Sequence, residues 1–227
     1  MIPVSDSRLR VLILGAGGHA QVVADILLRM RDAGSAIAPI GYLDDNIDLI
    51  GRTLLDLPVL GKIAEASNIE HDAVIVAIGH NATRKHIYAA LMARDERLIV
   101  ARHPYAIVAP DVLIGPGTTI CAGVVVNPGS AIGADVILNT GCTVDHHNAI
   151  GDHAHIAPGV HLGGDVQIGE GTLVGIGAAV IPQRTVGAWS VIGAGSVVTR
   201  NIPGHIVARG VPARVVRKLD QENRVSN

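Results

Sequence analysis

The chain has 227 residues, enough for two modest domains that each bury a core of their own. Its formal net charge of -2 gives no long-range attraction to nucleic acid or to an anionic membrane surface, and no apolar run approaches the roughly 20 residues that span a bilayer. Cys121 and Cys142 are too few for a disulfide framework and lack metal-ligand spacing. Because the start of the chain lacks a signal-peptide hydrophobic region, we expect a cytoplasmic protein.

The first hundred residues predict strands that alternate with helices. Three short apolar strands are expected, over residues 10–14, 38–43 and 73–78. The first is followed by the sequence GAGGHA and an amphipathic helix through about Arg31, and the second ends at the acidic pair Asp44 and Asp45. This alternation is typical of a small parallel sheet of the mononucleotide-binding, Rossmann-like kind. We assign residues 1–103 to this domain.

A six-residue repeat dominates the rest of the chain. Ile, Leu or Val occupies every sixth position without a break: Val108, Ile114, Ile120, Val126, Ile132, Leu138, Val144, Ile150, Ile156, Leu162, Ile168, Val174, Val180, Val186, Ile192 and Val198. Four residues after each of these comes a smaller side chain, from Thr118 to Ala178. Such hexads are the signature of a parallel β-helix, and the narrow core of that prism explains why the chain has no Phe.

Glycines add a longer period to the repeat. Gly115, Gly133, Gly151, Gly169 and Gly187 lie eighteen residues apart, so three hexads make one coil and the glycines mark one corner of successive coils. We expect glycine there because it tolerates backbone angles that other residues avoid. Residues 108–202 then form about five coils, within a β-helix domain that we place at 104–204. A short charged helix is expected in the C-terminal tail, 205–227.

Five of the eleven histidines lie within sixteen residues, namely His146, His147, His153, His155 and His161. None occupies either inward-facing class of the repeat, so all five are expected on the outside of the prism or at its corners. Imidazole titrates near neutral pH and can accept the proton of an attacking amine or hydroxyl. A zinc site of the γ-carbonic-anhydrase type is disfavoured, because no two histidines lie thirty-six residues apart as that family requires.

Five stretches of the chain together resemble one family. They are GAGGH, YLDD, AIGHN, residues 139–159 and the closing GVPAR. The likeness covers nearly the whole chain and is to the bacterial sialic-acid O-acetyltransferases and nucleotide-activated 4-amino-sugar N-acetyltransferases, whose hexapeptide repeats wind left-handed. The resemblance implies acetyl-CoA as acyl donor, no metal, and a homotrimer in which a neighbouring subunit closes each active site.

The resemblance also implies roles for single residues. His146 matches the catalytic base, and His155 matches the histidine that hydrogen-bonds the thioester region of acetyl-CoA. Gly164, Ile176 and Ala194 match positions whose backbones contact the CoA arm.

One position departs from the family pattern. The residue after the base is usually acidic and orients it, whereas this chain has His147, which we keep as a catalytic candidate. Either Asp145, Asp152 or a group of a neighbouring subunit orients His146, or the base is less strongly activated.

The glycine-rich opening fits a dinucleotide fingerprint at Gly15, Gly17 and Ala20, which places backbone N–H groups and a helix N-terminus near an anion. A purely structural turn is the alternative. A dehydrogenase is disfavoured because the β-helix leaves no second domain for hydride transfer. The resemblance suggests that the sugar-nucleotide diphosphate lies against Gly17, Gly18 and His19, with Asp44 or Asp45 near the base or ribose.

Together these observations predict an acetyl-CoA-dependent N-acetyltransferase that acts on a nucleotide-linked 4-amino-4,6-dideoxy sugar in surface-glycan biosynthesis. O-acetylation of sialic acid or a related sugar is the alternative within the class. A non-catalytic β-helix scaffold or a sugar-nucleotide-binding module is the alternative from another class, and His147 is the feature that favours it. No nucleic acid or membrane partner is expected.

Overall fold

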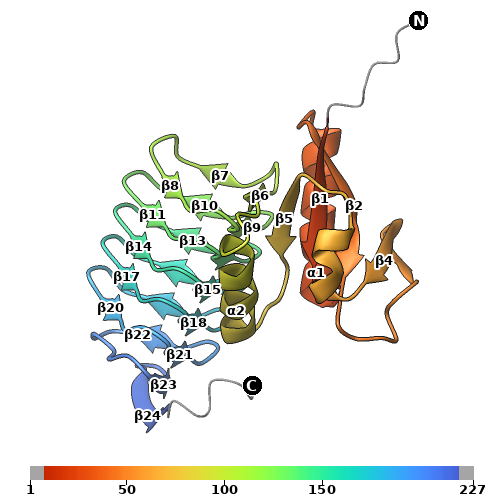
Figure 1. Cartoon of the computed structure of the whole chain (residues 1–227). Coiled ribbons are helices and arrows are strands. Elements are labelled where there is room, and N and C mark those ends of the chain that lie inside the picture. The colour runs from red at the N-terminus through yellow and green to blue at the C-terminus, as the bar shows by residue number, and fades with distance from the viewer. Residues whose placement is uncertain (1–7, 220–227) are drawn as a thin grey trace, which may run out of the picture.

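The computed structural model describes residues 8–219 and contains two units that pack side by side (Figure 1). An α/β unit comes first, and a three-sided prism of stacked short strands follows it. The predicted fold class, a Rossmann-like domain followed by a left-handed parallel β-helix, is confirmed. Among residues 8–219, neither helix is long and apolar enough to cross a bilayer.

The α/β unit is built on a five-stranded sheet in the order β3-β4-β2-β1-β5. All neighbouring strands are parallel except β3 and β4, which form a small antiparallel pair at the edge. The elements are β1 (Leu9–Leu14), α1 (Gly18–Asp32), β2 (Ile37–Leu43), β3 (Thr53–Leu54), β4 (Leu57–Gly61), the 3-10 helix η1 (Ile63–Asn68), β5 (Ala73–Val76) and α2 (Asn81–Met92). The three predicted strands correspond to β1, β2 and β5.

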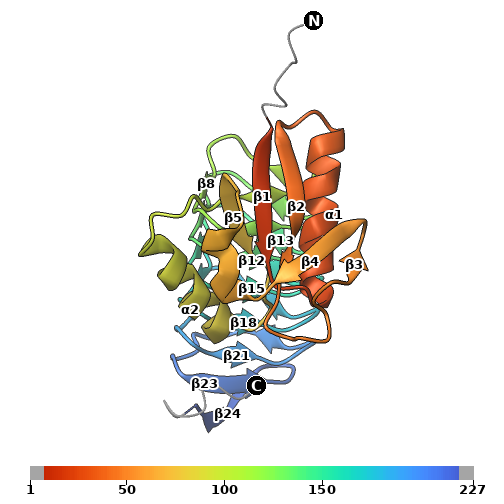
Figure 2. The same cartoon turned by 45° about the vertical axis from the view of Figure 1, so that its right-hand side comes forward.

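Strand β1 is apolar on both faces because a helix packs against each side of it. Val11 and Ile13 belong to the core that includes Val23 of α1, whereas Leu12 and Leu14 belong to a second cluster that includes Leu91 of α2. Figure 2 shows the two helices on opposite sides of this sheet. Such a continuous apolar run is typical of a parallel strand that is covered on both faces.

The prism has three faces, each a parallel sheet whose strands come from successive coils. The first face consists of β7 (Ile107–Val108), β10 (Val125–Val126), β13 (Thr143–Val144), β16 (His161–Leu162), β19 (Ala179–Val180) and β22 (Val197–Val198). The second face consists of β8 (Leu113–Ile114), β11 (Ala131–Ile132), β14 (Ala149–Ile150), β17 (Gln167–Ile168) and β20 (Thr185–Val186). The third face consists of β6 (Ala101–Arg102), β9 (Thr119–Ile120), β12 (Ile137–Leu138), β15 (His155–Ile156), β18 (Leu173–Val174), β21 (Val191–Ile192), β23 (Ile206–Arg209) and β24 (Arg214–Lys218).

Paired strands are eighteen residues apart, as the glycine period predicts. Ile137 pairs with His155, and His155 pairs with Leu173. Both inward-facing classes fill the core: the hexad aliphatics from Ile120 to Val198 are buried, and so are the smaller residues from Thr118 to Ala178. A core of this kind leaves no room for a phenyl ring.

The corner glycines are explained by crowding rather than by backbone angle. A Cβ on Gly115 would lie 2.5 Å from the backbone nitrogen of Ala134, and one on Gly151 would lie 2.6 Å from that of Glu170. Left-handed φ angles occur instead at every sixth residue from Gly117 to Gly195, and non-glycine residues such as His147 and His153 adopt them as well. The predicted reason for these glycines was therefore wrong, although their shared corner is correct.

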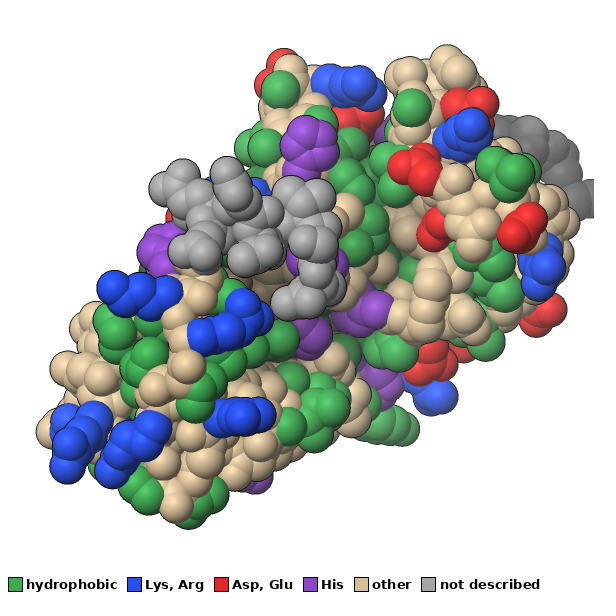
Figure 3. Space-filling model, turned by 90° about the horizontal axis from the view of Figure 1, so that it is seen from below, with side chains coloured by type: hydrophobic (Ala, Val, Ile, Leu, Met, Phe, Trp, Pro, Cys, Tyr) green, Lys and Arg blue, Asp and Glu red, His purple; other side chains and the backbone are tan. Residues whose placement is uncertain are grey.

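The chain beyond the coils forms strands where a helix was expected. From residue 205, β23 continues the third face by pairing with β21, and β24 turns back antiparallel to β23. The sequence RVVRK has no apolar stripe at helical spacing, and pairing with β23 satisfies its backbone hydrogen-bonding groups. The remaining part of the expected helix, residues 220–227, lies outside the described residues. Figure 3 shows Lys and Arg side chains gathered on the end of the prism that these strands close.

Candidate active site

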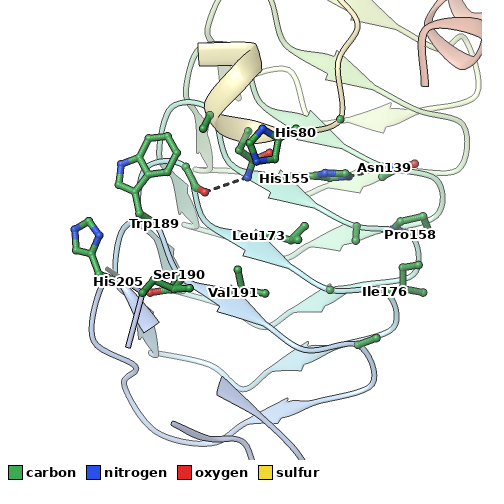
Figure 4. A pocket seen from close by; sticks show the side chains of 18 residues that line it. His80, Asn139, His155, Pro158, Leu173, Ile176, Trp189, Ser190, Val191 and His205 are labelled. Carbon is green, nitrogen blue, oxygen red and sulfur yellow. Dashed lines mark hydrogen bonds between the residues drawn. The ribbon is translucent and has the colours of Figure 1, made fainter. Parts of the chain in front are cut away.

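A cavity of about 760 Å³ lies on the third face, beneath the start of α2 (Figure 4). Its roof is the segment of residues 79–82, and its floor consists of His155, Leu173 and Val191. At the corner between the third and first faces it reaches Pro158, Ile176 and Ala194, and at the opposite corner it reaches Trp189 and His205. A cavity of this size is ample for a small-molecule ligand.

His155 lies on the floor of this cavity and is neutral at physiological pH. Burial, followed by the charge of Arg84 and the neighbouring His19, lowers the pKa of His155 to about 3. The Asn139 amide donates to Nε2 of His155 over 3.1 Å, and the ring is also hydrogen-bonded to the Gly79 backbone. Because Nε2 accepts, the ring proton resides on Nδ1, and both partners fix the orientation of the ring.

His19 connects the glycine-rich loop to the same histidine. It lies in the first turn of α1, and its ring centroid is 6.5 Å from that of His155. Burial and the charge of Arg84 lower the pKa of His19 to about 4. Its Nε2 atom is buried and has no hydrogen-bond partner among residues 8–219. A buried imidazole nitrogen without a partner keeps an unused hydrogen-bonding capacity that a ligand can satisfy.

The N-terminus of α1 is open to an anion. Gly17 caps the helix without a side-chain hydrogen bond, and the first turn has no acidic residue. A Cβ on Gly17 or on Gly18 would meet nothing within 4 Å, so there is open space beside the first turn, whose N–H groups have no partner within the helix. Gly15 has a different role: its φ is +112°, and a Cβ added there would lie 2.8 Å from the Ala77 carbonyl oxygen, so both conditions require glycine.

The acidic pair after β2 braces this loop. Asp44 accepts hydrogen bonds from the backbone nitrogens of Ala16, at 2.6 Å, and Asn46, at 2.8 Å. Asp45 accepts from the backbone nitrogen of Ile63 at 3.1 Å. Both oxygens of Asp44 are thus engaged by the protein backbone, and its predicted contact with the base or ribose stays a prediction.

His146 and His147 lie elsewhere, at the corner between the first and second faces. Both are exposed, and their Nδ1 atoms are 3.0 Å apart. The His146 ring covers Gly164, where a Cβ would lie 2.6 Å from Nε2, and His147 covers Gly129 in the same way. In this pair one Nδ1 carries a proton and donates to the other.

Neither carboxylate that sequence reasoning offered is hydrogen-bonded to the His146 ring. Asp145 accepts through Oδ1 from the Asn127 amide and from the backbone nitrogen of His146, both at 2.8 Å, and these bonds lower its pKa. Asp152 lies at a different corner, where its Oδ1 accepts from the backbone nitrogen of Ala134 at 2.8 Å. The side-chain partner of the His146 ring is therefore His147.

The candidate residues form two groups on different edges of the prism. One group comprises His146, His147 and Gly164 at the corner between the first and second faces. The other comprises His155 on the third face with Ile176 and Ala194 at its corner with the first face. The whole first face separates them, so one chain does not bring the two groups together. Among residues 8–219, no three His, Cys, Asp or Glu residues are grouped so that they could hold a metal ion.

Sequence reasoning missed three residues of the cavity region. Asn139 lies in the segment that carries the family resemblance. It follows β12, which pairs with β15, so its side chain lies beside His155 of the next coil. Trp189 is the single tryptophan, which marks it in a chain that is poor in aromatics. Arg84 resembles any helical arginine in the sequence, and only the packing of α2 against the coils buries it.

Known proteins share both units of the chain. Residues 10–91 match the PglD N-terminal domain, and residues 165–200 match the bacterial transferase hexapeptide repeat. The acetyltransferase domain of PglB from Neisseria gonorrhoeae, also solved with acetyl coenzyme A, is 34% identical, with 92% of this chain and 100% of that chain covered and a TM-score of 0.86. A GDP-perosamine N-acetyltransferase from Caulobacter crescentus, a histidine-to-alanine mutant with CoA and GDP-perosamine, is 36% identical over 92% of this chain and 97% of that chain, with a TM-score of 0.83.

Curated relatives match over shorter segments. A presumed acetyltransferase from Staphylococcus aureus is 61% identical over 44 residues, which are 19% of this chain and 22% of that protein. The galactoside O-acetyltransferase of Escherichia coli is 30% identical over 117 residues, which are 52% of this chain and 46% of that enzyme. The chain therefore spans less than half the length of these curated relatives.

Proposed function

Because the chain belongs to the hexapeptide-repeat sugar acetyltransferase family, as the resemblance predicted, we propose that it transfers the acetyl group of acetyl-CoA to the amine of a nucleotide-linked 4-amino-4,6-dideoxy sugar. The solved relatives that hold acetyl-CoA, or CoA with GDP-perosamine, support the donor and the class of acceptor. The observation on which this proposal rests is the pairing of His146 with His147, which leaves a ring nitrogen available as a base.

The histidine pair can perform the proton transfer without a carboxylate. When His146 donates its Nδ1 proton to Nδ1 of His147, the lone pair of His146 Nε2 is free. The neutral amine of the sugar attacks the thioester carbonyl carbon, and Nε2 accepts a proton from the attacking nitrogen. Collapse of the tetrahedral intermediate breaks the carbon–sulfur bond, and the thiolate of CoA takes that proton to leave as the thiol.

The second group supplies the donor side of the reaction. His155 lies in the cavity beside Asn139, close to where Ile176 and Ala194 form the outer corner. The thioester would lie near His155, and the pantetheine arm would extend along Ile176 and Ala194. Since His146 lies on another edge of the same prism, the complete site needs a second copy. We infer a homotrimer in which the His146 corner of one copy faces the cavity of the next.

The nucleotide belongs to the α/β unit. The N–H groups at the start of α1, with open space in front of Gly17 and Gly18, suit the diphosphate. The unpartnered Nε2 of His19 lies next to His155, so it connects the nucleotide side to the donor side of the site. This arrangement would direct the sugar from the loop toward the thioester.

O-acetylation of a sugar hydroxyl is a second candidate, supported by the match to galactoside O-acetyltransferase over half of the chain. The same base would then accept a hydroxyl proton. A non-catalytic scaffold loses its main support, because His147 can take the place of the expected carboxylate.

A thiol-release assay tests the proposal. Acetyl-CoA would be offered with UDP-, GDP- and dTDP-linked 4-amino-4,6-dideoxy sugars, with sialic acid as the hydroxyl acceptor. We expect thiol release with at least one amino sugar, loss of release in His146→Ala, and unchanged affinity of that variant for CoA. No release with any acceptor would favour the scaffold.

A further inference from the structure

A buried arginine joins the two units of the chain directly above the cavity. Arg84 of α2 is 1% exposed and uses each guanidinium nitrogen. Nη1 donates to the Ile78 carbonyl at 3.1 Å and to Oδ1 of Asn81 at 2.9 Å, which holds the segment before α2. Nε donates to the Asp135 carbonyl at 3.0 Å and Nη2 to the His153 carbonyl at 2.6 Å, which are corners of two successive coils. One planar group thus bridges a loop and two coils.

The guanidinium has a buried counter-ion. Oδ2 of Asp135 lies 3.2 Å from Nε of Arg84 and 2.8 Å from Nδ1 of His153, and Asp135 is completely buried. Burial raises the pKa of Asp135 and lowers that of Arg84, so each ion depends on the other. Oδ1 of Asp135 has no hydrogen-bond partner among residues 8–219. An apolar contact would join the units without burying these charges, so stability alone does not explain the arrangement.

The loop that Arg84 holds is the roof of the candidate site. Gly79, His80 and Asn81 line the cavity, and the Gly79 backbone is hydrogen-bonded to the His155 ring. Asn81 is fixed from its other side as well, because its Nδ2 donates to the Gly171 carbonyl at 3.0 Å. A shift of the guanidinium would therefore move the backbone partner of His155.

We propose that Arg84 is a positioning residue, which sets the distance between the loop of residues 78–81 and the coils and thereby aligns His155 with the reacting thioester. This role rests on the proposed acetyl transfer. Arg84 does not touch the sites of His146, Ile176 or Ala194, so it acts on alignment rather than on the attachment of CoA. A misplacement of about 1 Å in an active site can lower the rate by about 100-fold.

The test compares Arg84→Lys and Arg84→Met with the control Arg29→Met. Arg29 pairs with Asp25 on the exposed side of α1, so the control removes an arginine ion pair far from the cavity. With the acceptor found by the thiol-release assay, we expect kcat to fall at least about 10-fold in both Arg84 variants, while the dissociation constant for CoA, measured by calorimetry, changes by less than about 3-fold. A parallel loss of kcat and CoA binding would overturn the proposal, and so would full kcat in Arg84→Lys.

A second measurement does not depend on turnover. Nitrogen-detected titration of the histidine rings by NMR should show the pKa of His155 rising from about 3 in Arg84→Met, because burial under the closed loop and the charge of Arg84 both lower that pKa and outweigh the opposite effect of the Gly79 bond. If His155 titrates as in the wild type, Arg84 does not hold the loop, whatever the wild type acetylates. If Arg84→Met fails to fold, Arg84→Lys replaces it, because the ammonium keeps the positive charge but cannot bridge the loop and both coils as the planar guanidinium does. The pKa of His155 is again expected to rise, here through the loop alone, and an unchanged pKa would refute the proposal.

Discussion

The histidine pair makes a quantitative prediction about which ring does the chemistry. Loss of a general base lowers the rate by about 10²- to 10⁴-fold, so His146→Ala should lose that much kcat. His147→Ala removes one neutral hydrogen bond, of about 1 kcal/mol net, so kcat should fall by only about 5-fold. His147→Asp should restore the lost rate, because a carboxylate accepts from Nδ1 of His146 more strongly than imidazole does and Asp tolerates the left-handed φ of +57°.

These variants are measured by steady-state thiol release, with CoA affinity followed separately by calorimetry. All three should bind CoA as the wild type does, because neither histidine side chain contacts Ile176 or Ala194, along which the pantetheine arm is proposed to extend. Equal losses in His146→Ala and His147→Ala would refute the assignment of base and partner. A His147→Asp variant slower than His147→Ala would show that the Nδ1 contact does not orient the base.

Three further outcomes follow from the packing and the titrating groups. Gly151→Ala should lower the free energy of unfolding by about 1–3 kcal/mol, because its Cβ would meet Glu170 N at 2.6 Å, whereas Gly18→Ala, with nothing within 4 Å, should not; equal denaturant midpoints would contradict this. His155 and His19 have folded-state pKa values of about 3 and 4, below the usual value near 6.5. The unfolded chain therefore binds protons more readily than the folded protein, so the free energy of unfolding is unaffected above pH 6.5 and falls as the pH drops toward 4. The loss should reach about 2 kcal/mol per histidine at pH 5 in urea unfolding, and His155→Gln should remove about half of it; an unchanged pH dependence would show that His155 is not buried neutral. Burial raises the pKa of Cys121 to about 11 and that of Cys142 to about 12, so a thiol reagent at pH 8 should modify both only after unfolding, and rapid labelling of the folded chain would contradict their burial.

Much of the fold was predictable because each coil contacts only its neighbours, so a local period in the sequence becomes a period in space. Sequence reasoning gave the wrong physical cause for the corner glycines, because a close approach between coils and an unusual φ angle both select glycine and the sequence does not tell them apart. It also failed at Arg214–Lys218, where the decisive interaction is pairing with β23 rather than any property of the segment.

The site was predictable in its parts and not in its arrangement. The outward positions of His146 and His155 follow from the hexad frame, but their separation by the whole first face does not. The buried bridge of Arg84, Asp135 and His153 depends on how α2 docks against the coils, which no period in the sequence records. His153 was expected outside the core classes, and it is buried where Tyr88 of α2 packs edge-on against its ring, with the ring centroids 5.3 Å apart.

The eighteen-residue coil makes the length of the prism change only by whole coils. Ile176 and Ala194 occupy the same corner one coil apart, so the edge beside His155 lengthens or shortens only in steps of about 4.8 Å. Duplicating the coil that ends at Ala194 would keep the strands in register and leave His146, Gly164 and His155 with their present neighbours. The reach of the donor along that edge can therefore change in whole steps without any redesign of the chemistry.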